Sequence, residues 1–203
     1  MRLAMPAEAR RVELGDPARA VREYAEIIGE LRDAPEGAAA DLEALAAESV
    51  EGVLRQGAFL MAVVAPAAAD PALLTGVALV VPDGWDIDTA DALRDSLEDV
   101  GGPDLRQTVL VESGVGPAVV AQRVPGVEQA RAGEPLALQL QAFIPEPGSG
   151  RMLLLTLSAP SQRGWAEHQA LFTGMVASAS PTETGSTARP EPDESFEQHT
   201  YRL

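Results

Sequence analysis

The sequence predicts an α+β fold, in which a mainly antiparallel sheet of about six strands packs against three to four helices, two of them N-terminal. Three observations support this class. The start of the chain carries two apolar stripes with helical spacing, and later segments are apolar runs of strand length. Several of these runs are joined by links too short for a parallel crossover, which favours antiparallel pairing.

Two consecutive amphipathic helices are expected first. Asp16 offers an N-cap acceptor and Pro17 suits a first helical turn, so the first helix should begin there. After breakers at Pro35 and Gly37, a second apolar stripe occupies residues 38–55. The first stripe consists of apolar residues spaced by three or four positions: Val21, Tyr24, Ala25, Ile28 and Leu31.

Two strands and a third helix should follow. Residues 58–65 and 73–81 are short apolar runs, and the turn-forming residues between them favour an antiparallel hairpin. A helix is expected at about 86–100, with an acidic outer face. Its inward face should carry five apolar residues: Ile87, Ala90, Leu93, Leu97 and Val100.

Four strands and one helix should complete the domain. The strands are expected at residues 107–112, 118–124, 136–144 and 152–158, joined by Gly- and Pro-containing links into a meander. The last helix, at about 164–178, should pack on the sheet. The face that it turns to the sheet has six members: Trp165, His168, Leu171, Phe172, Met175 and Val176.

Residues 1–179 are therefore expected to form one α+β domain, followed by a disordered tail at 180–203. The tail is acidic, rich in Pro, Ser and Thr, and has too little apolar surface to offset the entropy of ordering. Phe196, Tyr201 and Leu203 gather near its end, as apolar anchors do in segments that fold on binding. A plain solvated tail is the alternative interpretation.

Composition excludes several functional classes. With 15 basic and 31 acidic residues the formal net charge is −16, and so acidic a surface repels nucleic acid. There is no cysteine and there are two histidines, which nearly excludes zinc chemistry. No apolar run reaches the roughly 20 residues that span a bilayer, and no export signal is visible. We therefore expect a cytoplasmic protein without a membrane partner.

No arrangement typical of catalysis is present, and no catalytic residue, cofactor or metal is predicted. The chain lacks a G-x-S-x-G nucleophile elbow. His168 is the one candidate general base, but it lies on the apolar stripe of the last helix, where a structural role is expected. Gly114 and Gly116 precede Pro117 without a third glycine or a following helix, which favours a strand connection over a phosphate loop.

The candidates for partner binding are acidic and aromatic. The aspartates at 83–95 lack the order of an EF-hand, so helix capping by Asp86 or Asp88 is expected rather than metal binding. Residues 86–100 carry six acids against Arg94, a net of −5, which would speed encounter with a cationic partner unless the face is merely solvated. The candidates are Trp85, Asp86, Asp88, Asp91, Asp95, Glu98, Phe143, Phe196 and Tyr201.

Four segments carry a resemblance to a known fold: GPAVV at 116–120, FIPEPG at 143–148, LLLTLSAP at 153–160, and a helix with Leu171 and Phe172 near its middle. Through them residues 107–179 resemble actinobacterial proteins related to the PsbP-like α/β sandwich, a fold also found in a Ran-binding nuclear import factor. The absence of Lys and Asn fits such a high-GC source. Because proteins of that fold mostly act as binding or assembly subunits, the resemblance implies a non-enzymatic role.

Two functional hypotheses result. The first is a cofactor-free interaction protein, such as an adaptor, a chaperone or an immunity-type inhibitor, that docks a basic protein partner through its acidic surface. The alternative is a small-molecule-binding protein or hydrolase with a pocket between the sheet and the helices, using carboxylates such as Glu112 or Glu134.

Overall fold

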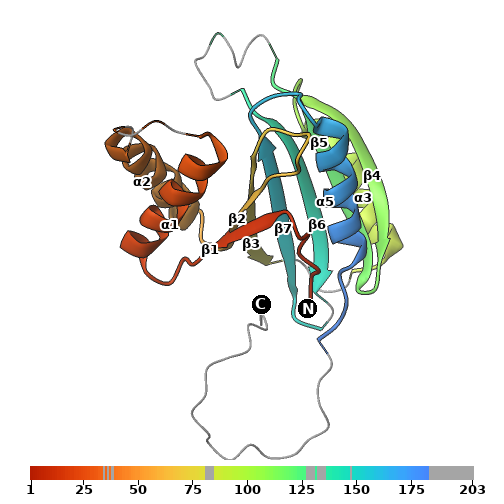
Figure 1. Cartoon of the computed structure of the whole chain (residues 1–203). Coiled ribbons are helices and arrows are strands. Elements are labelled where there is room, and N and C mark those ends of the chain that lie inside the picture. Colours follow the sequence, from red (N-terminus) through yellow and green to blue (C-terminus); the bar gives the residue numbers. More distant parts are fainter. Residues whose placement is uncertain are drawn as a thin grey trace, which may run out of the picture.

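The computed structural model describes residues 1–33, 35, 37, 39–80, 85–126, 131, 136–146 and 148–182 (Figure 1). Within the described residues, the helices are α1 (Pro17–Leu31), α2 (Ala39–Arg55), α3 (Ile87–Val100) and α5 (Trp165–Ala177). The strands are β1 (Ala9–Val12), β2 (Ala58–Val64), β3 (Ala72–Val80), β4 (Leu105–Ser113), β5 (Gly116–Arg123), β6 (Leu138–Glu146) and β7 (Arg151–Ala159).

The strands form one seven-stranded sheet in the order β1-β2-β3-β7-β6-β5-β4, and every neighbouring pair is antiparallel. The predicted α+β class is thus confirmed, and the two N-terminal helices are present. The β6–β7 link is tight enough to pair Glu146 with Arg151, as short antiparallel connections allow. Among the described strands, the one pairing of strands that are not consecutive along the chain joins β3 to β7 at the centre of the sheet.

The strand missing from the sequence prediction is β1, which makes seven strands rather than about six. Its four residues include Arg10 and Arg11, so no apolar run reveals it. It is an edge strand that pairs with β2 alone, where Val12 faces Met61 and is buried. The hydrogen bonds that stabilise this strand come from β2 at the edge of the sheet, and the local sequence does not predict them.

The strand β2 is buried on both of its faces. Leu60, Ala62 and Val64 belong to a core shared with α5, while Met61 and Val63 belong to a second core shared with α1 and α2. Successive side chains of a strand point to opposite faces, so these two sets mark the two sides of the sheet. The helices accordingly lie on opposite sides of it, α1 and α2 on one and α5 on the other (Figure 1).

The helix α3 covers the far end of the sheet on the same side as α1 and α2. It contacts β4 and β5, and the carboxylate of Glu98 accepts a hydrogen bond from Thr108 of β4. Thr108 pairs with Ala121 of β5, which is fully buried although it points away from the α5 core. The helix α3 therefore covers the face of the sheet opposite α5. Between α3 and the α1–α2 hairpin, the central strands present half-buried side chains on this face: Thr75, Thr156, Gln141 and Phe143.

One part of the α3 prediction was wrong. Ala90 is fully buried and Leu93 and Leu97 are half-buried, but Ile87 is 47% exposed and Val100 is 78% exposed. The helix covers only two end strands, so its central turns contact the sheet while its first and last residues extend beyond it.

The start of α5 is fixed by the loop between β2 and β3. The hydroxyl of Ser161 donates to the Asp70 carboxylate at 2.6 Å, and the Asp70 amide donates to the carbonyl of Arg163 at 3.2 Å. Gly164 adopts a φ of 72°, and a Cβ there would lie 2.0 Å from the Cβ of Ala69. Only glycine permits both this backbone conformation and this close approach.

The first three residues of the predicted tail belong to the described structure. Ser180 exchanges two backbone hydrogen bonds with Arg2, at 2.8 and 3.0 Å, and the Met1 ammonium donates to the Thr182 hydroxyl at 2.7 Å. The N-terminal residues and the segment after α5 therefore run side by side at this end of the sheet. Residues 183–203, with the proposed anchors Phe196 and Tyr201, lie outside the described residues.

The close approach at Gly164 generates a prediction. Gly164→Ala should destabilise the fold by about 2 to 4 kcal/mol, because it combines an unfavourable positive φ with a clash against backbone. For a domain of this size that corresponds to a fall in melting temperature of roughly 5 to 15 °C, measured by circular dichroism. The matched control is Gly174→Ala within α5, where a Cβ meets nothing within 4 Å; it should leave the melting temperature unchanged or raise it slightly.

Candidate functional site: an acidic helix and a cavity

The acidic helix α3 begins at a defined cap. The Asp86 carboxylate accepts hydrogen bonds from the amide of Thr89 at 2.9 Å and from its hydroxyl at 2.8 Å. These two donors stabilise the charged form and hold the pKa of Asp86 below its ordinary value. Of the two residues predicted as possible N-caps, the structure selects Asp86, and Asp88 lies in the first turn.

Further carboxylates of α3 have local partners. Arg94 lies between Asp91 and Asp95, with nitrogen–oxygen distances of 2.6 and 2.8 Å. The hydrogen bond to Asp95 raises the pKa of the Arg94 guanidinium further above its usual value. Among the described residues, the carboxylates of Asp88 and Asp99 make no ion pair and both residues are exposed. Arg94 is the one cation of the helix, so its net charge remains −5.

Two predicted aromatic candidates lie on the same side of the sheet as α3. The indole of Trp85 donates to the carbonyl of Pro117 at 2.8 Å, which fixes the segment that enters the helix. Phe143 pairs with Val119, two residues further along β5, and points away from the α5 core. Both aromatic side chains are half-buried. The structure therefore brings Trp85, Phe143 and the acids of α3 to one face.

His168 lies in the α5 core, away from this face. It is fully buried, and its Nε2 lies 2.8 Å from the carbonyl oxygen of Asp70, while its Nδ1 is buried without a hydrogen-bond partner. A proton on Nε2 allows that bond to form. The partner is a backbone carbonyl rather than a carboxylate, so His168 joins the α5 helix to the β2–β3 loop.

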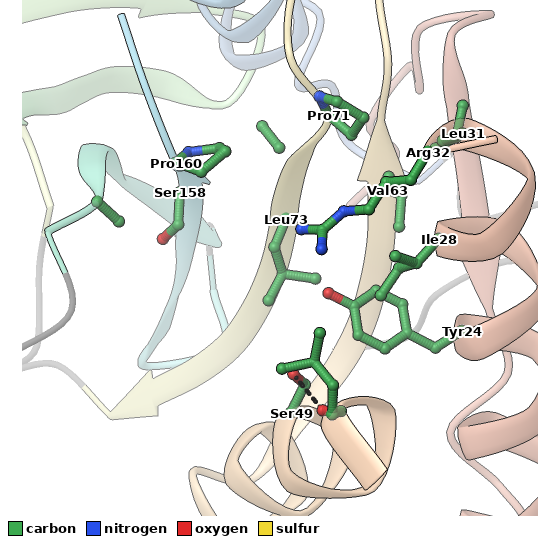
Figure 2. A pocket seen from close by; sticks show the side chains of 13 residues that line it. Tyr24, Ile28, Leu31, Arg32, Ser49, Val63, Pro71, Leu73, Ser158 and Pro160 are labelled. Atoms are coloured by element: carbon green, nitrogen blue, oxygen red, sulfur yellow. Dashed lines mark hydrogen bonds between the residues drawn. The ribbon is translucent and has the colours of Figure 1, made fainter. Parts of the chain in front are cut away.

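A cavity of about 230 Å³ lies between the α1–α2 hairpin and the sheet (Figure 2). Its walls come from α1, α2, β2, β3 and β7, and its residues are mostly apolar, with three polar side chains on the helices: Tyr24, Arg32 and Ser49. Burial raises the pKa of the Tyr24 hydroxyl, while Ser49 and Arg32 act in the opposite direction. Arg32 reaches from the end of α1 toward Leu73 (Figure 2).

The carboxylates suggested for a hydrolase are not found at this cavity. Glu112 is exposed on the edge strand β4, opposite Pro117, and Glu134 lies outside the described residues. Sequence reasoning missed the polar residues that do line the cavity. Tyr24 interrupts an otherwise aliphatic helical stripe, and that was the one signal in the sequence that pointed to it.

The described part of the chain offers neither a metal-binding cluster nor a membrane-spanning helix. No three His, Asp or Glu side chains there are grouped so that they could hold a metal ion. None of its helices combines the length and the apolar character needed to cross a membrane.

Comparison with known proteins found no matching family description and no curated protein with detectable similarity.

The cap of α3 should make stability depend on pH. Since the pKa of folded Asp86 is lowered, its contribution is present above the unfolded value of about 4 and is lost as the pH falls through the lower folded value. Asp86→Ala should therefore melt below the wild type at pH 7, and the difference should shrink as the pH falls below about 4. Asp88→Ala is the control and should lower the melting temperature less than Asp86→Ala at pH 7. An effect of Asp86→Ala that stays the same at all pH values would contradict the role of the cap.

Substitution of His168 tests its structural role. His168→Leu should cost about 1 to 3 kcal/mol, because the Asp70 carbonyl would be left without its donor, whereas His168→Gln can still donate and should cost less. Denaturant unfolding measures both. A folded His168→Gln variant should also retain partner binding, and loss of binding would contradict a purely structural role.

Proposed function

We propose that the protein is a non-enzymatic, cytoplasmic interaction protein, of adaptor, chaperone or immunity-inhibitor type, that docks a basic protein partner through the acidic face of α3. The observation that carries the proposal is the charge of this face. Residues 86–100 hold six carboxylates against one guanidinium, and none of the six is buried. A field of one sign steers an oppositely charged partner toward the surface.

The local partners of these carboxylates do not cancel the charge. Thr89 and Thr108 are neutral donors, so they orient Asp86 and Glu98 without neutralising them. Arg94 offsets one charge while contacting both Asp91 and Asp95. Carboxylates held in place lose less side-chain entropy when a partner binds, which favours recognition by fixed acidic groups.

The aromatic residues beside α3 complete the docking face. Trp85 and Phe143 are half-buried on the side of the sheet that α3 covers, and aromatic side chains are enriched where partners bury surface. Phe196 and Tyr201 remain candidates for a second contact from the C-terminal segment.

The resemblance of residues 107–179 to PsbP-like proteins supports a binding role. A sheet with helices on both faces has the layer order of an α/β sandwich, and that fold mostly serves binding or assembly.

Paired charge variants test the docking face. Asp88→Asn with Asp99→Asn removes two exposed acids from α3, and Glu43→Gln with Glu48→Gln removes two exposed acids from α2, so both raise the net charge by the same amount. Capture of a basic protein from a cell lysate at low salt should fall about threefold or more with the α3 variant and stay unchanged with the α2 variant. Capture should also weaken at high salt. Equal effects of the two variants would assign the interaction to overall charge and contradict this face.

The cavity favours a second candidate function, a small-molecule-binding protein. Its position between the sheet and the helices is the one expected for a ligand pocket. The hydrolase form of this candidate has no support from Glu112, which lies on a distant edge strand.

A further inference from the structure

The cavity under the helical hairpin combines apolar walls with a cation. Its walls include Ile28 of α1, Leu45 of α2, Val63 of β2 and Leu73 of β3. Arg32 is the charged residue among those that line it. A ligand matched to this lining has an apolar body and one negative group.

Arg32 is available for such a group. Two other arginines near the hairpin are paired, Arg10 with Glu30 and Arg19 with Glu23, whereas the guanidinium of Arg32 makes no ion pair or hydrogen bond with the described residues. It is also the C-cap residue of α1, where a positive charge suits the helix dipole. That dipole interaction accounts for a cation at this position but does not require the side chain to extend over the cavity, as it does in Figure 2.

Of the three hydroxyl groups that line the cavity, on Tyr24, Ser49 and Ser158, the two on the helices narrow the ligand class. Ser49 already donates to the carbonyl of Leu45 at 2.9 Å, so its hydroxyl proton is in use. The Tyr24 hydroxyl points into the cavity near Ser49, and it keeps its proton at neutral pH, since the ordinary pKa of tyrosine is about 10 and burial raises the pKa of Tyr24 further (Figure 2). Arg32 and Tyr24 therefore both offer hydrogen-bond donors, and a carboxylate is a pure acceptor with a shape that suits a guanidinium.

We propose that this cavity binds a small monocarboxylic acid with an apolar body, its carboxylate on Arg32 and Tyr24 and its body against Ile28, Val63 and Leu73. The volume of about 230 Å³ lies just below the range of roughly 300 to 1,000 Å³ typical of drug-sized ligands, so a body of medium-chain length fits. This inference rests on the second candidate function and is independent of docking by α3.

Three eight-carbon probes test the chemistry: octanoate and octylammonium below their micelle-forming concentrations, and octanol below its solubility limit, each titrated into the full chain by calorimetry. Octanoate should bind saturably, and the two other probes should bind about tenfold more weakly, because only octanoate complements the Arg32 guanidinium. Absence of octanoate binding, or equal binding of octanol, would overturn the proposal.

Matched variants locate the site. Arg32→Gln should weaken octanoate binding about tenfold and Tyr24→Phe by a smaller factor. Arg22→Gln makes the same charge change on the same helix, but Arg22 borders a separate cavity of about 360 Å³ between α1 and α2, so binding should be unchanged. A larger effect of Arg22→Gln than of Arg32→Gln would place the acid in that other cavity and overturn the assignment.

Methyl shifts in nuclear magnetic resonance spectra give a second measurement that does not depend on substitution. Octanoate should shift the methyl groups of Leu45, Val63 and Leu73 and leave that of Leu42, which borders the other cavity, unchanged. The α3 variant Asp88→Asn with Asp99→Asn should bind octanoate like the wild type. If the wild type captures a basic partner but does not bind octanoate, this inference alone is overturned. If it binds octanoate but captures no basic partner, only the docking proposal is overturned.

Discussion

Burial of β2 on both faces is the constraint on which the rest of the structure depends. Its alternate side chains enter two separate cores, one completed by α5 and the other by the α1–α2 hairpin. A strand covered on both sides cannot slip by one residue without exchanging the two sets, so its register with β1 and β3 is strongly specified. The C-terminal helix and the N-terminal helices are thereby held on one sheet although they are far apart in the sequence.

Both candidate sites arise because the helices on one face leave part of the sheet uncovered. The hairpin packs over β1 and β2, while α3 packs over β4 and β5. The cavity lies where the hairpin meets β3 and β7, at the border of the central strands. The acids of α3 lie on the side of that helix that faces away from the sheet. The two sites therefore occupy separate parts of the same face, and their ligands would have opposite charge.

Local chemistry explains much of what the sequence predicted about the sites. An aspartate directly before an amphipathic helical stripe is an N-cap signal, and Asp86 behaves accordingly by accepting a hydrogen bond from the amide of Thr89. The cavity could not be predicted in the same way. Tyr24 interrupts an aliphatic stripe, but Arg32 and Ser49 carry no signal in the sequence, and these residues meet Leu73 only because the hairpin folds back on the sheet.

The sequence by itself determined the α+β class, the positions of the helices and six of the strands, because helical spacing, strand-length apolar runs and Gly or Pro breaks act over short distances. Tertiary structure decided what depends on distant partners. Arg10 and Arg11 became part of a strand because β2 offered an open edge, and Ile87 and Val100 stayed exposed because α3 extends beyond the two strands beneath it. Burial is a property of what lies opposite a residue in space, and neighbours in sequence do not specify it.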